Sequence, residues 1–192
     1  MPIEKTKSTD TVASGLIAKT SAGEGVGAGG VFTLICLDKD GNLKWEEKGH
    51  NLVVNEGLQY MVATSLDASA QTTPWYLGLI QGPGASVSGT ATMATKGFTE
   101  VTAYSQSTRP QCVFGTATTA NPSVIDNTAN TAQFDMTGTA VIGGAFLTSN
   151  NVKSPGTAGI LFSGKAFSSP GDRSVVSGDI LRVTYTFSLT GT

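Results

Sequence analysis

An alternation of apolar and polar residues near the carboxyl end constrains the fold of this chain more than any other feature. Over residues 180–189 every second side chain is large and apolar, and the side chains between them are charged or hydroxylated. Side chains of a β-strand point alternately to the two faces of its sheet. The pattern therefore predicts a strand with one face on a core and the other toward solvent. The inward set is Leu181, Val183, Tyr185, Phe187 and Leu189.

Strand-like segments of similar length recur along the chain and are separated by clusters rich in Gly, Ser, Pro and Asn, which are typical of turns. A parallel α/β sheet would need a helix between successive strands, and the sequence offers one helix. We therefore predict an all-β fold, an antiparallel β-sandwich or jelly-roll-like domain with one short helix. The expected strands are residues 31–37, 43–46, 51–54, 74–81, 99–104, 109–116, 131–137, 139–148, 159–167 and 180–189.

The first two of these strands are expected to form a hairpin. Residues 31–37 are apolar on both faces, and residues 38–42 (DKDGN) have the composition of a tight turn. Leu43 and Trp45 then share one face of the second strand. Asp38, Asp40 and Asn42 also match the start of a calcium loop, but Leu43 and Gly49 stand where that loop needs Gly and Glu. A hairpin turn is the better interpretation.

The one expected helix begins at Asn55, a favourable N-cap residue, and Glu56 suits the positive end of its dipole. A helix of about 12 residues is marginal in isolation, so we expect it to pack on a sheet through its apolar face. The residues expected on that face are Leu58, Met61, Val62 and Leu66.

Residues 1–30 differ in composition from the rest and are expected to form a flexible amino-terminal arm, leaving residues 31–192 as the β domain. Five glycines fall within residues 23–30, a density that favours neither a helix nor a strand, so we predict a hinge there. The expected hinge residues are Gly25, Gly27, Gly29 and Gly30. The residues expected to contact a neighbouring subunit are the apolar pair Leu16 and Ile17, with Lys5, Lys7 and Lys19.

Composition and charge exclude several classes of function. The chain has 12 Lys and Arg against 14 Asp and Glu, a net charge of −2, so it lacks the basic stripe of a nucleic-acid-binding protein. No apolar run approaches the roughly 18 residues of a membrane helix, and the amino terminus lacks the apolar core of a secretory signal. We expect synthesis in a cytoplasm and no membrane partner. Cys36 and Cys112 lie in apolar runs and are expected to be reduced core residues, with a disulfide as the alternative.

No motif in the chain predicts a catalytic or cofactor site. Residues 25–30 match G-x-G-x-x-G, but the dinucleotide motif works between a strand and a helix, and here a strand follows. His50 is the single histidine, and no G-x-S-x-G elbow accompanies it. Two cysteines and one histidine cannot build a usual zinc site. We expect no enzyme activity, metal or cofactor. Carboxylates that a glycosidase could pair are Glu100, Asp126, Asp135, Asp172 and Asp179.

Several segments together resemble small β-rich virion proteins of tailed bacteriophages, closest in character to capsid decoration (cement) proteins. The resemblance covers about residues 43–190. The segments are NLVVNEGL (51–58), TPWYLGL (73–79), GFTE (97–100), YSQSTRP (104–110), IGGAFL (142–147) and GDILRVTY (178–185).

The resemblance implies a non-enzymatic structural protein on the capsid exterior, made in the host bacterial cytoplasm. Its implied partners are the major capsid protein and copies of itself, as a homo-oligomer at a symmetry axis. The arm residues named above would then form a contact with the capsid. The alternative is an adhesion or tail-fibre module of the virion that binds a host glycan through Trp45, Trp75 or Tyr104.

Overall fold

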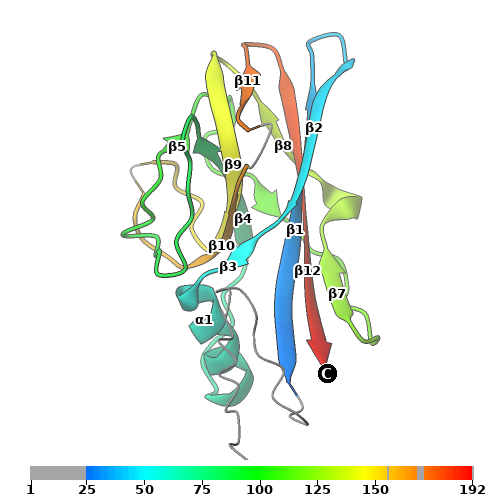
Figure 1. Ribbon diagram of the computed structural model, residues 1–192, viewed down its shortest axis with the longest axis vertical. Helices are drawn as coiled ribbons and strands as arrows, with labels where there is room; N and C mark the ends of the chain where they lie inside the picture. The colour runs from blue at the N-terminus through cyan, green and yellow to red at the C-terminus, as the bar shows by residue number, and fades with distance from the viewer. Residues whose placement is uncertain (1–24, 155, 168–170, 192) are drawn as a thin grey trace, which may run out of the picture.

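The computed structural model describes residues 25–154, 156–167 and 171–191 of the chain. These residues form two antiparallel sheets packed face to face, with one α-helix at an end of the molecule (Figure 1). The predicted β-sandwich is therefore confirmed.

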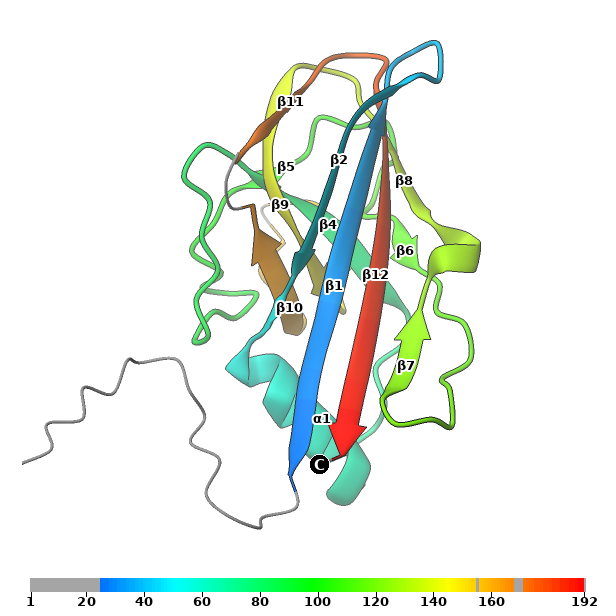
Figure 2. The same ribbon diagram turned by 45° about the vertical axis from the view of Figure 1, so that its right-hand side comes forward.

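The first sheet is built around two long strands that lie side by side (Figure 2), β1 (Val26–Leu37) and β12 (Ile180–Gly191). β2 (Leu43–His50) borders β1, which confirms the predicted hairpin. β7 (Ser123–Asp126) and β8 (Ala132–Asp135) pair with opposite ends of β12, and a short 3-10 helix (Thr128–Asn130) connects them. The predicted register of β12 is confirmed for Leu181, Val183 and Tyr185, which are fully buried, and Phe187 is partly buried. The sequence also predicts that Leu189 points inward, but it is 38% exposed near the end of the strand, so that part of the prediction is wrong.

The second sheet has β9 (Ala140–Thr148) at its centre, between β10 (Leu161–Ala166) and β4 (Trp75–Gln81). Short strands complete it: β3 (Leu52–Val53) on β10, β5 (Glu100–Val101) and β6 (Gln111–Cys112) on β4, and β11 (Arg173–Val175) on β9.

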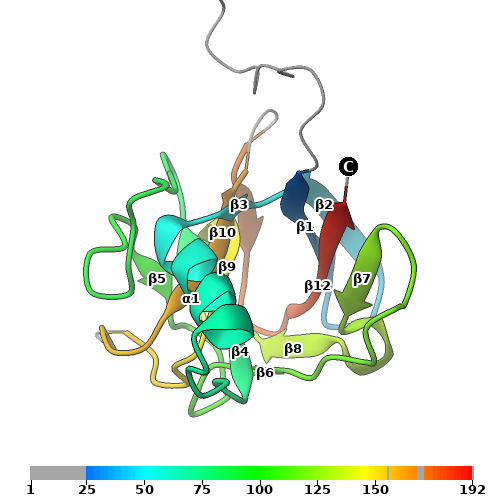
Figure 3. The ribbon, with the colours of Figure 1, turned by 90° about the horizontal axis from the view of Figure 1, so that it is seen from below.

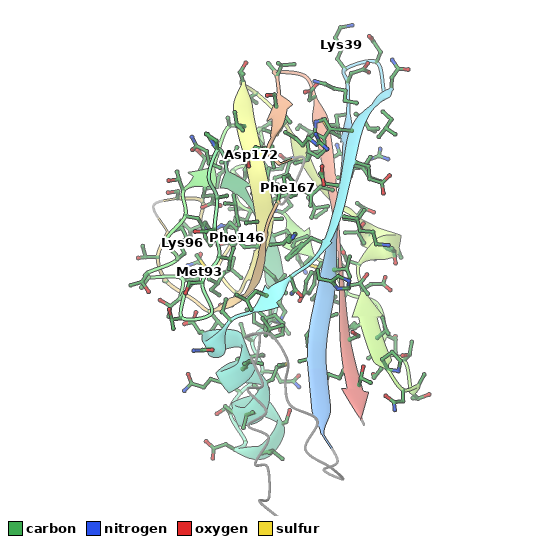
Figure 4. All side chains as sticks on the ribbon, viewed as in Figure 1. Lys39, Met93, Lys96, Phe146, Phe167 and Asp172 are labelled. Carbon is green, nitrogen blue, oxygen red and sulfur yellow. The ribbon has the colours of Figure 1, made fainter. Side chains whose placement is uncertain are left out.

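Both faces of this second sheet are covered. One face meets the first sheet across the main core, and the loop between β4 and β5 covers the other with a second apolar cluster. In that cluster Met93 lies near Phe146 of β9, on the side away from β1 (Figure 4). Burial on both faces explains why the sequence of β9 is a continuous apolar run, without the alternation of apolar and polar residues seen in β12.

A bulge interrupts the pairing of β9 with β4 at Gly143 and Gly144. The register passes from Ile80 opposite Gly144 to Gln81 opposite Ile142, which leaves Gly143 unpaired in that ladder. A Cβ atom on Gly144 would lie 2.0 Å from the carbonyl oxygen of Lys165, so only glycine allows β10 to approach here. The expected bulge or close backbone contact is confirmed.

The helix α1 (Asn55–Leu66) forms where it is predicted, but it packs through a different face. The expected N-cap, Asn55, is the first residue of the helix instead, and Val54 is the N-cap, with no side-chain hydrogen bond to cap the helix. The carboxylate of Glu56 accepts hydrogen bonds from the backbone N–H groups of Leu161 (2.7 Å) and Met93 (3.3 Å). Gly57 is buried, and a Cβ atom there would lie 2.2 Å from the carbonyl oxygen of Phe162. This close approach turns the Gly57 side of the helix toward the sheet.

The predicted glycine hinge is wrong for most of its length. Gly27, Gly29 and Gly30 lie inside β1, which pairs with β12 from Val26 opposite Gly191 onward. Gly25 directly precedes the strand. Continuous antiparallel pairing supplies the backbone with partners that local glycine preferences cannot predict. The domain therefore includes residues assigned to the arm, and its boundary moves from residue 31 to at least Val26.

Candidate functional site

One end of the sandwich brings the helix next to the ends of the two long strands of the first sheet, and we call it the helix end. β1 begins and β12 ends there beside α1, whereas the turn between β1 and β2 lies at the opposite end (Figure 1). Seen from below, the helix end shows α1 on one side and β1, β12 and β7 on the other (Figure 3). Two apolar features lie at this end.

The first feature is a cavity of about 180 Å³ between the two sheets, which we call the aromatic pocket. Its walls come from seven segments of the chain, so no local pattern marks it, and the sequence analysis did not predict it. Six of its eight residues are aromatic. The lining residues are Tyr60, Trp75, Phe114, Ile125, Leu147, Phe162, Tyr185 and Phe187.

The aromatic rings of the pocket support one another edge to face. Trp75 lies between Tyr60 and Phe162, with ring centroids 5.2 and 5.4 Å away, and Phe162 meets Phe187 at 5.3 Å. Such pairs favour fixed ring orientations beyond the area they bury. The pocket walls are therefore held in place by their own packing.

The two tyrosine hydroxyl groups of the pocket are engaged by other parts of the protein. The hydroxyl of Tyr185 accepts hydrogen bonds from Asn51 Nδ2 (2.9 Å) and Ser163 Oγ (3.1 Å), and that of Tyr60 accepts one from the Thr72 N–H (2.7 Å). Burial raises the pKa of Tyr185 well above its usual value, so the phenol stays neutral. The pocket thus presents mainly ring carbon and aliphatic carbon.

The second feature is an apolar stripe on the exposed side of α1, which we call the helix stripe. Leu58, Val62 and Leu66 follow one another at intervals of four residues and are 42, 60 and 84% exposed. Residues four apart lie on the same face of a helix. The prediction that these three side chains pack on the sheet is wrong, because the Gly57 side of the helix faces the sheet instead. Met61, the fourth residue of the predicted face, is partly buried against the main core, as expected.

The residues expected to contact a neighbouring subunit lie outside the described part of the chain. Leu16 and Ile17, together with Lys5, Lys7 and Lys19, belong to residues 1–24. Their role in binding stays a prediction. The described chain resumes at Gly25, directly before the first residue of β1 at the helix end.

The three aromatic residues considered for glycan binding pack against different parts of the protein. Tyr104 is buried against Phe134, with ring centroids 4.9 Å apart. Trp75 lines the aromatic pocket, and Trp45 is half-buried against Phe167 while its indole N–H donates to the carbonyl oxygen of Ser174. The three rings therefore do not share one surface, and binding of a glycan by any one of them stays a prediction.

The carboxylates weighed for catalysis have structural partners. Glu100 forms a fully buried ion pair with Arg109, and Asp179 accepts from Lys44 Nζ at 2.5 Å. The Asp135 carboxylate accepts from two glutamine side chains, and that of Asp126 accepts from Thr128, which lowers the Asp126 pKa. For Asp172, the carboxylate lies close beside Gly82 and Gly143.

The other candidate sites also have structural surroundings. His50 is exposed at the end of β2, and the Asp38 carboxylate accepts from backbone N–H groups of Asp40 and Asn42 within the hairpin turn. Cys36 and Cys112 are buried free thiols, and burial raises the pKa of Cys36 to about 11. Across residues 25–154, 156–167 and 171–191, no three His, Cys, Asp or Glu side chains gather as metal ligands would.

Comparison of the chain with models of protein families, with curated proteins and with solved structures gives no match. Within the described residues no helix has the length and apolar character required to cross a membrane.

Proposed function

We propose that this protein is a non-enzymatic structural component of a tailed-phage virion that binds the outer capsid surface as a decoration protein and stabilises the shell. The observation that carries the proposal is the helix stripe, Leu58, Val62 and Leu66, which leaves a row of large apolar side chains in solvent. The resemblance of residues 43–190 to small virion proteins supplies the identity of the partner.

An exposed apolar helix face favours a protein partner over a small molecule. Contiguous exposed apolar patches on soluble domains mark interaction surfaces, and an amphipathic helix commonly docks through residues at intervals of three and four. The stripe also lies at the helix end, so a shell bound there would leave the turn between β1 and β2 facing outward (Figure 1).

The energy available from the helix stripe can be estimated from its exposure. Together the three residues expose about as much apolar surface as two complete side chains. Burying that surface contributes roughly 3–6 kcal/mol, or about a 100-fold or greater gain in affinity. A standard interface covers about 800 Å² on each partner, so the stripe would form the apolar centre of a larger contact.

Binding of purified protein to shells lacking it tests the proposal. The double variant Val62→Asp/Leu66→Asp should lower affinity about 100-fold in co-sedimentation, because it places two charges at the centre of the contact. Both side chains are exposed, so the fold should be kept. Leu43→Asp is the matched control, since Leu43 is 62% exposed next to the turn at the opposite end.

The proposal predicts that Leu43→Asp binds shells like the unmodified protein. Equal binding by the double variant and the control would reject the helix stripe as the contact. Failure of the unmodified protein to bind shells at all would reject the decoration role.

A further inference from the structure

The walls of the aromatic pocket belong to both sheets, so the pocket cannot shrink without a movement of the strands. Phe187 and Ile125 come from β12 and β7 of the first sheet, and Trp75 and Phe162 come from β4 and β10 of the second (Figure 3). β12 pairs with both β1 and β7, and β9 pairs with both β4 and β10. Surrounding structure relaxes only partially around a cavity. The two paired sheets therefore hold the pocket at a fixed width.

The size of the aromatic pocket matches one small organic ring. Protein interiors contain few voids larger than a water molecule, whereas the aromatic pocket measures about 180 Å³. An apolar cavity of about 150 Å³ is large enough to bind benzene. Ile125 and Phe187 are only partly buried, so the pocket can be reached from solvent.

The lining of the pocket favours an uncharged aromatic ligand. Among the described residues that line it, none is Asp, Glu, Lys, Arg or His. An ionised ligand would lose its hydration there without gaining a counter-charge. An aromatic ligand ring can instead continue the edge-to-face packing by which Trp75 meets Tyr60 and Phe162. The hydroxyl groups of Tyr60 and Tyr185 already accept hydrogen bonds from other parts of the protein, so the ligand needs no polar group.

We propose that the aromatic pocket binds one small uncharged aromatic molecule, of about the size of toluene, between the two sheets. This binding site goes beyond the proposed function and does not depend on it, because the helix stripe lies on the exposed side of α1 and takes no part in the pocket. The pocket exists only while the two sheets are packed together. A ligand that binds there therefore stabilises the folded state and raises the Tm in proportion to its occupancy.

Titration of toluene into the full-length protein tests the proposal. In a Trp45→Phe background Trp75 is the single tryptophan, and it lines the pocket, so its emission should change saturably as toluene is added. The Tm should rise over the same range of toluene concentration. Benzoate carries a carboxylate on the same ring and should bind at least about 100-fold more weakly, because its charge would be buried without a partner. No saturable response to toluene, or equal affinity for benzoate, would overturn the proposal.

A variant that narrows the pocket tests whether toluene binds there and not elsewhere. Ile125→Phe places a larger side chain in the pocket and should weaken toluene binding roughly 10-fold or more. Val124→Phe, the matched control, changes the neighbouring residue of β7, whose side chain points to the other face, and should leave the affinity unchanged. Equal toluene affinities in the two folded variants would reject the aromatic pocket as the site.

Nuclear Overhauser effects in the unmodified protein give a readout that does not depend on either variant folding. Bound toluene should show intermolecular effects to the ring protons of Trp75 and Phe187, which come from opposite sheets. Saturable binding of toluene without these effects would also reject the proposal.

Discussion

The buried ion pair between Arg109 and Glu100 allows a prediction with a well-defined magnitude. Both side chains are 0% exposed, and Arg109 donates to both carboxylate oxygens at 2.7 and 2.8 Å. Arg109 also donates to the carbonyl oxygen of Asn150, and Glu100 accepts from the Ser154 N–H. The pair therefore joins β5, the loop between β5 and β6, and the loop between β9 and β10.

Arg109→Met should destabilise the domain by about 3–5 kcal/mol, because it leaves the Glu100 carboxylate buried without its counter-charge. The carboxylate would keep the hydrogen bond from Ser154, and the Asn150 carbonyl would lose its donor. In a domain of this size the loss corresponds to a fall in Tm of roughly 6–20 °C. Urea unfolding followed by circular dichroism measures the free energy directly, provided that the slope with denaturant is unchanged.

A second variant separates buried charge from lost packing. Glu100→Gln combined with Arg109→Met removes both charges while retaining an acceptor for Ser154, so it should recover most of the loss. A cost for Arg109→Met of about 1 kcal/mol or less, the value of a surface ion pair, would refute the reasoning. So would a double variant that is no more stable than the single one.

Two further predictions concern the core. Val183→Asp should lower the free energy of unfolding by several kcal/mol, because Val183 is fully buried. Thr184→Asp, on the opposite face of β12, should change it by less than about 1 kcal/mol. Equal unfolding midpoints for the two variants would contradict the register. Cys36 and Cys112 should react slowly with a thiol reagent at pH 8 in the folded protein, since burial raises both pKa values and keeps the thiols protonated. After denaturation both thiols should react rapidly. Fast labelling of the native protein, followed by mass spectrometry, would count against burial of these thiols.

Strands with a strong periodic signal are the part of the fold that sequence reasoning predicts well. Apolar and polar side chains alternate along β12 because one face of the strand meets the core. Local turn residues specify the hairpin; the Asp38 carboxylate, for example, accepts hydrogen bonds from two backbone N–H groups of the turn. β7 and β11 were not predicted, because each is too short to show a sustained alternation of apolar and polar residues. Pairing with a longer neighbour creates these strands, and that neighbour is distant in sequence.

The helix and the glycine segment show how tertiary contacts override local preference. Periodicity predicts Leu58, Val62 and Leu66 on the packed face, yet the close approach of Gly57 to the Phe162 carbonyl selects another face. The glycines before Val31 favour no regular structure alone, yet pairing with β12 holds them in a strand. The aromatic pocket is assembled from distant segments, so its composition could be predicted only once the sheets were in register.

The proposed decoration role is tested most directly by the temperature at which virions release DNA. Virions lacking this protein should release DNA at a lower temperature than complete virions, and adding the purified protein should restore the midpoint. The Val62→Asp/Leu66→Asp variant should fail to restore it, and Leu43→Asp should succeed. Stripped particles that are as heat-resistant as complete ones but no longer adsorb to cells would contradict the decoration role and favour an adhesion module.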